Sequence, residues 1–139
     1  MWGRFLLSHH REHELHRCYK LRGTFLCARC VGLYPVLLLA LTAQFVFRAH
    51  PGEMAVEPWI VLGLSVPAMV DWMLGQWWPH AFSNAWRSFT GGLLGLALGR
   101  TLYIHMREPF PMGLRWQLLA SLIVVVWVFL LKWARPASS

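Results

Sequence analysis

The sequence predicts an all-α fold, a bundle of four transmembrane helices preceded by a cytoplasmic segment rich in histidine and cysteine. Of the 139 residues, 57% are hydrophobic and only 14% are charged, whereas about a quarter of a soluble domain is charged. Four apolar segments follow one another, and no Ser/Gly-rich linker or repeat interrupts them. We therefore divide one domain into a His/Cys-rich cytoplasmic segment (1–30) and a four-helix membrane domain (31–135).

The first two spans are predicted at 31–47 and 56–78. A transmembrane helix needs about 20 predominantly apolar residues, and both segments approach or exceed that length once the helix ends are included. Pro35 falls in the first turn of its helix, where a missing amide hydrogen costs little. Pro67 is expected to bend the second span, and Asp71 follows it by one turn.

The third and fourth spans are predicted at 89–106 and 116–133. Gly91, Gly95 and Gly99 recur every four residues, so they share one helix face and let another backbone approach closely. We expect this face to serve helix packing, and it is also where an oligomer contact is expected. The fourth span carries no internal charge and is therefore expected to face lipid.

The basic residues predict the orientation of the chain in an inner (plasma) membrane. With the N-terminus in the cytoplasm, nine of the thirteen Lys and Arg residues lie on the cytoplasmic side, which leaves four for the other side. Cytoplasmic loops carry an excess of Lys and Arg, so both termini are expected in the cytoplasm. We exclude nucleic acid as a partner, because the basic residues adjoin apolar spans and suit anionic lipid headgroups.

The segment from Ser8 to Tyr34 contains all three cysteines and four of the seven histidines. Cys27 and Cys30 form a Cys-x-x-Cys chelating pair, and Cys18 supplies a third thiolate. Thiolate and imidazole ligands together favour zinc, and three cysteines with one histidine complete a tetrahedral site. We therefore predict a zinc site at the cytoplasmic membrane face, with ligands drawn from Cys18, Cys27, Cys30, His9, His10, His13 and His16.

The same cysteines allow two other interpretations. Cys27 precedes a helix and Arg29 is close, and both features lower a thiol pKa, as in membrane thiol–disulfide oxidoreductases. The predicted orientation, however, places Cys27 and Cys30 in the reducing cytosol. In the simplest interpretation, the cysteines are small buried side chains and the histidines are interfacial.

Asp71 is an ionisable residue inside a span, and such residues are functional candidates by default. Its expected partners are Arg87, Arg100 or a bound metal. A purely structural ion pair with Arg100 is the alternative. Sequence position alone does not decide between them.

A second candidate site lies at the start of the third helix. Ser83, Asn84 and Arg87 could bind the phosphate of an anionic lipid headgroup there, because the free amide groups of a helix N-terminus favour anions. The alternative is an ordinary helix cap, with Arg87 reaching to the membrane surface. Asp71 and Arg87 are also the candidate catalytic residues if the protein is an enzyme that acts on such a headgroup.

Several short motifs recur in a known family of membrane proteins. They are His9-His10, Arg17-Cys18, Cys27-Ala28-Arg29-Cys30 and Gly32-Leu33-Tyr34-Pro35, with weaker matches at Asp71, Gly75, Ser83-Asn84, Arg87 and Thr90-Gly91. Through these motifs the chain resembles the small polytopic membrane proteins catalogued as domain of unknown function 2085, over most of the chain from Ser8 to about Gly95. This resemblance implies a membrane protein and no particular activity.

Overall fold

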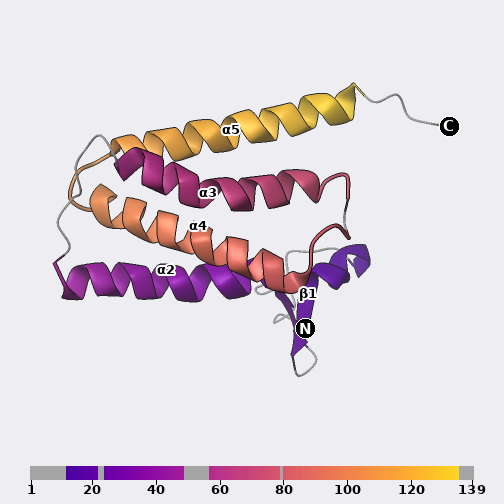
Figure 1. Ribbon diagram of the computed structural model, residues 1–139, viewed down its shortest axis with the longest axis horizontal. Helices are drawn as coiled ribbons and strands as arrows, with labels where there is room; N and C mark the ends of the chain where they lie inside the picture. The colour runs from indigo at the N-terminus through magenta and orange to yellow at the C-terminus, as the bar shows by residue number, and fades with distance from the viewer. Residues whose placement is uncertain (1–11, 22–23, 49–56, 79, 135–139) are drawn as a thin grey trace.

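A computed structural model describes residues 12–21, 24–48, 57–78 and 80–134, and these are mostly helical (Figure 1). They contain four α-helices, as the sequence predicted. The helix ends differ from the expected spans by up to five residues. The helices are α2 (Ala28–Val46), α3 (Glu57–Leu74), α4 (Asn84–His105) and α5 (Met112–Trp133).

The four helices lie side by side, and each runs opposite to the helix before it in the sequence (Figure 1). The α4 helix packs on both α2 and α3, and α3 packs on α5. The start of α2 and the end of α5 consequently lie at the same end of the bundle.

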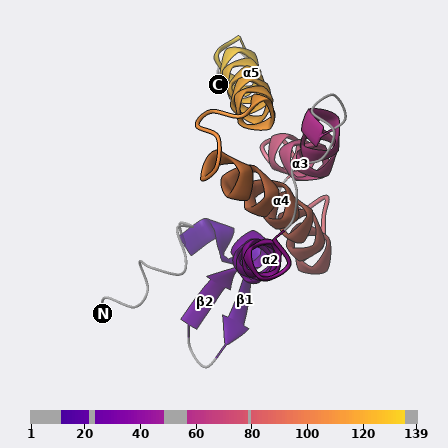
Figure 2. The same ribbon diagram turned by 90° about the vertical axis from the view of Figure 1, so that its left-hand side faces the viewer.

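The N-terminal part of the described chain adds a feature that the all-α prediction missed. A 3-10 helix, η1 (Glu12–Arg17), leads into strands β1 (Cys18–Leu21) and β2 (Thr24–Cys27), which pair antiparallel. The strands contain Tyr, Thr, Phe and Leu, and two residues separate them, a spacing typical of a β-hairpin. Figure 2 shows this hairpin beside the start of α2, away from α3 and α5. We call this side of the bundle the hairpin end.

The bundle places small residues inside and large apolar residues outside. Nine apolar side chains are buried among the described residues, whereas 32 large hydrophobic side chains are exposed. The α5 helix buries only Gln117 and Val128, in keeping with its expected exposure to lipid. Two helices, α2 and α5, are long and apolar enough to cross a membrane. The surface of the bundle therefore suits a lipid solvent better than water.

Glycines bring α2 and α4 into direct backbone contact. A Cβ atom on Gly91 would lie 2.4 Å from the carbonyl oxygen of Arg29, and one on Gly95 would lie 2.5 Å from that of Leu33. The close approach predicted for this face is thus confirmed, with α2 of the same chain as the neighbour. An oligomer contact through these glycines would require α2 to leave the face.

A chain of buried polar side chains links α3, α4 and α5. The Gln117 side chain on α5 donates a hydrogen bond to Ser65 Oγ (2.9 Å) on α3 and accepts one from Thr101 Oγ1 (2.9 Å) on α4. All three side chains are buried. Such hydrogen bonds hold helices together where a hydrophobic driving force between them is weak.

Candidate functional site

The hairpin brings the three cysteines together at the start of α2. Cys18 lies directly opposite Cys27 in the β1–β2 pairing, and a side-chain hydrogen bond joins Cys27 to Cys30. Cys18 and Cys27 are buried, Cys30 is partly exposed, and no disulfide joins any of the three. We call Cys18, Cys27 and Cys30, the three cysteines predicted as metal ligands, the thiol cluster.

The expected complete ligand set is not assembled within the described part of the chain. No three His, Cys, Asp or Glu side chains are grouped there so that they could hold a metal ion. The His16 ring stacks against His80, with ring centroids 4.4 Å apart, instead of facing the thiol cluster as a ligand. The side chains of His9, His10 and His13 lie outside the described residues.

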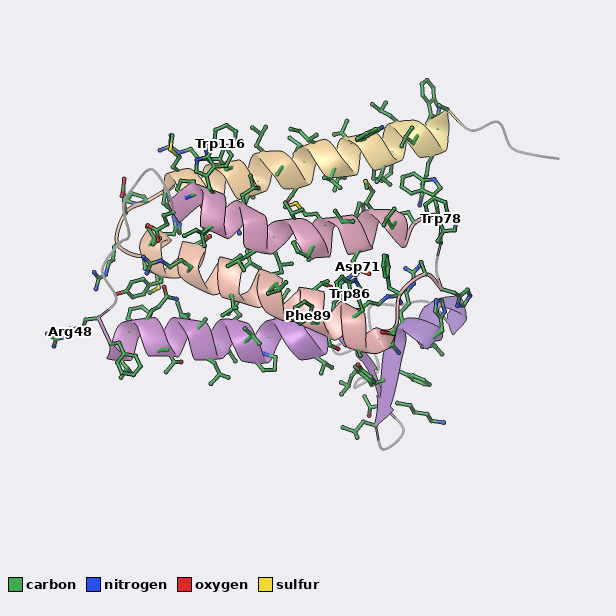
Figure 3. All side chains as sticks on the ribbon, in the orientation of Figure 1. Arg48, Asp71, Trp78, Trp86, Phe89 and Trp116 are labelled. Atoms are coloured by element: carbon green, nitrogen blue, oxygen red, sulfur yellow. The ribbon has the colours of Figure 1, made fainter. Side chains whose placement is uncertain are left out.

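Asp71 pairs with Arg29, not with Arg100 as the structural alternative had it. Arg29 Nε donates to Asp71 Oδ2 at 2.6 Å, and Arg29 Nη2 forms an ion pair with the same oxygen. The Asp71 carboxylate is buried, with 1% of its side chain exposed, between α3 and α4 near the hairpin end (Figure 3). Because Arg29 stands between Cys27 and Cys30, this pair ties the thiol cluster to α3.

Arg100 belongs to a separate group at the opposite end of the bundle. Its Nε atom pairs with Glu57 of α3, and its Nη1 atom donates to Gln44 Oε1 of α2 at 3.0 Å. Glu57 precedes Asp71 by 14 residues, about 21 Å along a helix. The distance along α3 therefore explains why Arg100 cannot serve Asp71.

Two further arginines lie near Asp71. Arg17 Nη2 donates to the carbonyl oxygen of Gly75 at 2.7 Å, where the exposed carbonyls of the α3 C-terminus favour a cation. Arg87 is buried and interacts electrostatically with Arg17, Asp71 and Arg29. The two candidate catalytic residues, Asp71 and Arg87, are thus brought together.

Ser83 and Asn84 have structural roles in the described chain. Ser83 caps α4 by accepting a hydrogen bond from the Trp86 amide (3.2 Å). The Asn84 amide donates to the carbonyl oxygens of His16 (3.1 Å) and Cys18 (3.3 Å), which fastens η1 and β1 to α4. Of the three predicted anion ligands, this leaves Arg87 as the side chain with the chemistry for the task.

Sequence reasoning missed the contributions of Arg29, Arg17 and Ser88. Ser88 Oγ lies 2.8 Å from the Ala28 carbonyl oxygen and 3.2 Å from the Tyr19 hydroxyl, so it joins α4 to both α2 and β1. Arg29 could have been found, because it starts a span on the side where the helix carrying Asp71 ends. Arg17 and Ser88 depend on the hairpin, which the sequence reasoning did not predict.

Comparison with known proteins identifies a family for this chain. The family described as predicted membrane protein (DUF2085) matches residues 10–101, which is most of the chain. The protein belongs to the DUF2085 family. The comparisons with curated proteins and with solved structures found no match.

The DUF2085 match identifies the chain as a membrane protein and covers the whole β1–β2 hairpin. It spans the thiol cluster, Asp71, Arg87 and nearly all of α4, and it ends before α5. Apart from His9, the candidate site residues of this DUF2085 protein therefore lie inside the segment that the family matches.

Proposed function

We propose that all four helices cross the membrane and that the hairpin end carries a zinc site. Exposed aromatic residues support four spans, because Trp and Tyr are enriched at the two membrane interfaces. Trp116 and Trp133 are exposed near the two ends of α5, about 26 Å apart at 1.5 Å per residue. Trp59 stacks on Trp116 at one end (6.4 Å), and Trp78 and Trp86 lie toward the other (Figure 3). The spacing suits a hydrocarbon core about 30 Å thick.

The charges of α3 and α4 are compatible with crossing. Asp71 pairs with Arg29, and Glu57 pairs with Arg100. Each of the two acidic residues of α3 would therefore enter the membrane together with a neighbouring cation. Ionisable residues within spans usually face the bundle interior and pair with one another. The family description supports a membrane location. The excess of Lys and Arg that the predicted topology assigns to the side of the hairpin supports a cytoplasmic position for it.

The zinc proposal rests on the thiol cluster. Cys27 hydrogen-bonds Cys30 and is paired with Cys18 across the hairpin, so three soft ligands lie in one part of the fold. The described side chains are not yet grouped as a metal site, so zinc would have to draw them together. One imidazole from His9, His10, His13 or His16 would complete a Cys3His set. Zinc bound there would hold the hairpin on α2 and supply a fixed charge at the membrane face.

Metal analysis of the full chain, purified in detergent, tests this proposal. We expect about one zinc per chain in the wild type and a loss of most of it in Cys27→Ser and in Cys30→Ser. His105→Ala is the matched control, because His105 accepts a hydrogen bond from the Phe110 amide at the far end of α4. This variant should keep its zinc.

The same purified protein also distinguishes the zinc site from the alternative function, a thiol–disulfide oxidoreductase. A chain without zinc, in which thiol labelling finds a disulfide between two of the cysteines, would favour redox chemistry. A chain with three free thiols and no metal would overturn both proposals and leave the cysteines as packing residues.

A further inference from the structure

Three arginines from separate segments meet at the hairpin end. Arg17 ends η1, Arg29 lies in the first turn of α2, and Arg87 lies in the first turn of α4. Arg87 interacts electrostatically with both of the others and with Asp71. We call Arg17, Arg29 and Arg87 the arginine cluster.

The arginine cluster is held in place before any ligand arrives. Arg17 is fixed on the Gly75 carbonyl oxygen, and Arg29 is fixed on Asp71. Arg87 is buried, with 3% of its surface exposed. A planar guanidinium presents several donors in a rigid fork that matches the oxygens of a phosphate group. Bringing three such groups together costs repulsion, which a multivalent anion relieves.

Asp71 adds an acceptor beside these donors. Its Oδ2 atom contacts Arg29, whereas its buried Oδ1 atom makes no hydrogen bond to any described residue. An ionised carboxylate only accepts hydrogen bonds. A partner for Oδ1 must therefore carry a hydrogen, and an anion can do so only if it keeps an O–H group.

We propose that the arginine cluster binds the phosphate of a phosphomonoester and that Asp71 Oδ1 accepts the hydrogen of its P–OH group. The second pKa of such phosphates is about 6, so the form with one P–OH is available near neutral pH. A phosphodiester lacks this hydrogen. Asp71 would therefore favour a monoester such as phosphatidic acid over a diester without a headgroup hydroxyl, such as phosphatidylmethanol.

The position of the arginine cluster fits a group at the membrane surface. Asp71 lies in the last turn of α3, seven residues before the exposed Trp78, and Trp86 lies one residue before Arg87. Tryptophan side chains of this kind sit at the headgroup level. The same site would also accept free phosphate from the aqueous side, so the ligand's source needs its own measurement.

Calorimetric titration of the full chain in detergent tests the inference with three probes. They are dioctanoyl phosphatidic acid, dioctanoyl phosphatidylmethanol and inorganic phosphate. We expect phosphatidic acid to bind about tenfold tighter than phosphatidylmethanol, the value of one hydrogen bond to a charged group. If inorganic phosphate binds as tightly as phosphatidic acid, the site takes the phosphate alone. If it binds far more weakly, the site takes the lipid. Both results support the phosphomonoester site.

Variants assign the binding to these residues. Arg87→Gln should weaken phosphatidic acid about tenfold or more, whereas Arg48→Gln, a matched change at the other end of the bundle, should leave it unchanged. Asp71→Asn should remove the preference for the monoester. If that variant fails to fold, judged by its thermal unfolding midpoint, Arg87→Gln and the wild-type preference still decide. Equal binding by Arg87→Gln and the wild type, or equal binding of the two lipids by the wild type, would overturn the proposal.

Discussion

Arg29 stands between two cysteines of the thiol cluster, and its guanidinium forms an ion pair with Asp71, 42 residues further along the chain. One side chain thereby connects the hairpin, α2 and α3. The Asp71 side chain is almost completely buried, whereas about a quarter of the Arg29 side chain is exposed. Its contribution can be measured because each charge is costly when the other is removed.

We predict that Asp71→Asn destabilises the bundle and that Arg29→Gln, added to it, restores part of the loss. Removing one member of a buried pair costs about 3–5 kcal/mol, and we expect about 2–3 kcal/mol here because Arg29 is partly exposed. Removing the second charge should recover at least half. Thermal or denaturant unfolding of the detergent-purified variants measures both effects.

Arg100→Gln is the matched control for this cycle. Arg100 pairs with Glu57 at the other end of α3, so its removal should add to the loss in Asp71→Asn instead of offsetting it. Recovery by Arg100→Gln, and none by Arg29→Gln, would contradict the pairing described above.

The contact between α2 and α4 gives a second prediction. A Cβ atom on Gly32 would lie 1.9 Å from the carbonyl oxygen of Ser88, so Gly32→Ala must push two backbones apart. Overpacking of this kind costs about 1–3 kcal/mol, and we expect the upper part of that range because backbone cannot rotate away. The unfolding midpoint of the variant should fall accordingly.

Gly63→Ala is the comparison for this prediction. No atom lies within 4 Å of a Cβ placed on Gly63, and alanine is favoured over glycine in a helix interior by about 1 kcal/mol. This variant should be as stable as the wild type or slightly more stable. A similar loss at both glycines would mean that the α2–α4 contact contributes little.

The sequence was sufficient for the helices and for the close face of α4, because apolar length and glycine spacing are local properties. It was also sufficient for the cap at Ser83, one of the two interpretations of that residue. It was not sufficient for the partner of Asp71. That choice depends on depth, since Arg100 lies 13 residues, about 20 Å, beyond Arg87 along α4. Counting residues from the hairpin end of each helix would have separated Asp71 from Arg100.

The hairpin was missed for a different reason. Its strands have four residues each, which is too short for the alternation of apolar and polar residues to be recognised. The seven potential metal ligands in the same segment favoured an interpretation as a metal site. What fastens it is long-range: Asn84 donates to backbone carbonyls at the η1–β1 junction, and Ser88 contacts Tyr19. Contacts across more than 60 residues are not visible in a local pattern.

The buried polar chain gives a third prediction. In Gln117→Met the hydrogen bonds to Ser65 and Thr101 are lost, but both hydroxyls retain acceptors on their own helices, Val61 O and Ala97 O (each 2.9 Å). The loss should therefore be modest, about 0.6–1.7 kcal/mol, as for other hydrogen bonds between membrane helices.

Gln76→Met serves as the comparison for Gln117→Met. The Gln76 side chain accepts a hydrogen bond from Lys132 at 2.7 Å in an exposed position, where water replaces the lost partner. We expect no measurable change in the unfolding midpoint. An equal loss in the two glutamine variants would argue against a buried role for Gln117.

The last prediction concerns orientation. Successive helices run in opposite directions, so the hairpin and the end of α5 share one end of the bundle (Figure 1). Nine of the thirteen basic residues belong to that end in the predicted topology, and basic residues favour the cytoplasm. A reporter fused after Ser139 should therefore behave as cytoplasmic. A reporter inserted after Pro109, in the connection between α4 and α5, should behave as extracytoplasmic.

The reverse result would change the chemistry proposed for the thiol cluster. Extracytoplasmic cysteines meet an oxidising environment, where disulfides form and persist. Cys27 and Cys30, already joined by a hydrogen bond, would then be suited to forming a disulfide instead of binding zinc. The location of the reporters thus decides whether the Cys27–Cys30 pair is suited to zinc binding or to disulfide formation in the cell.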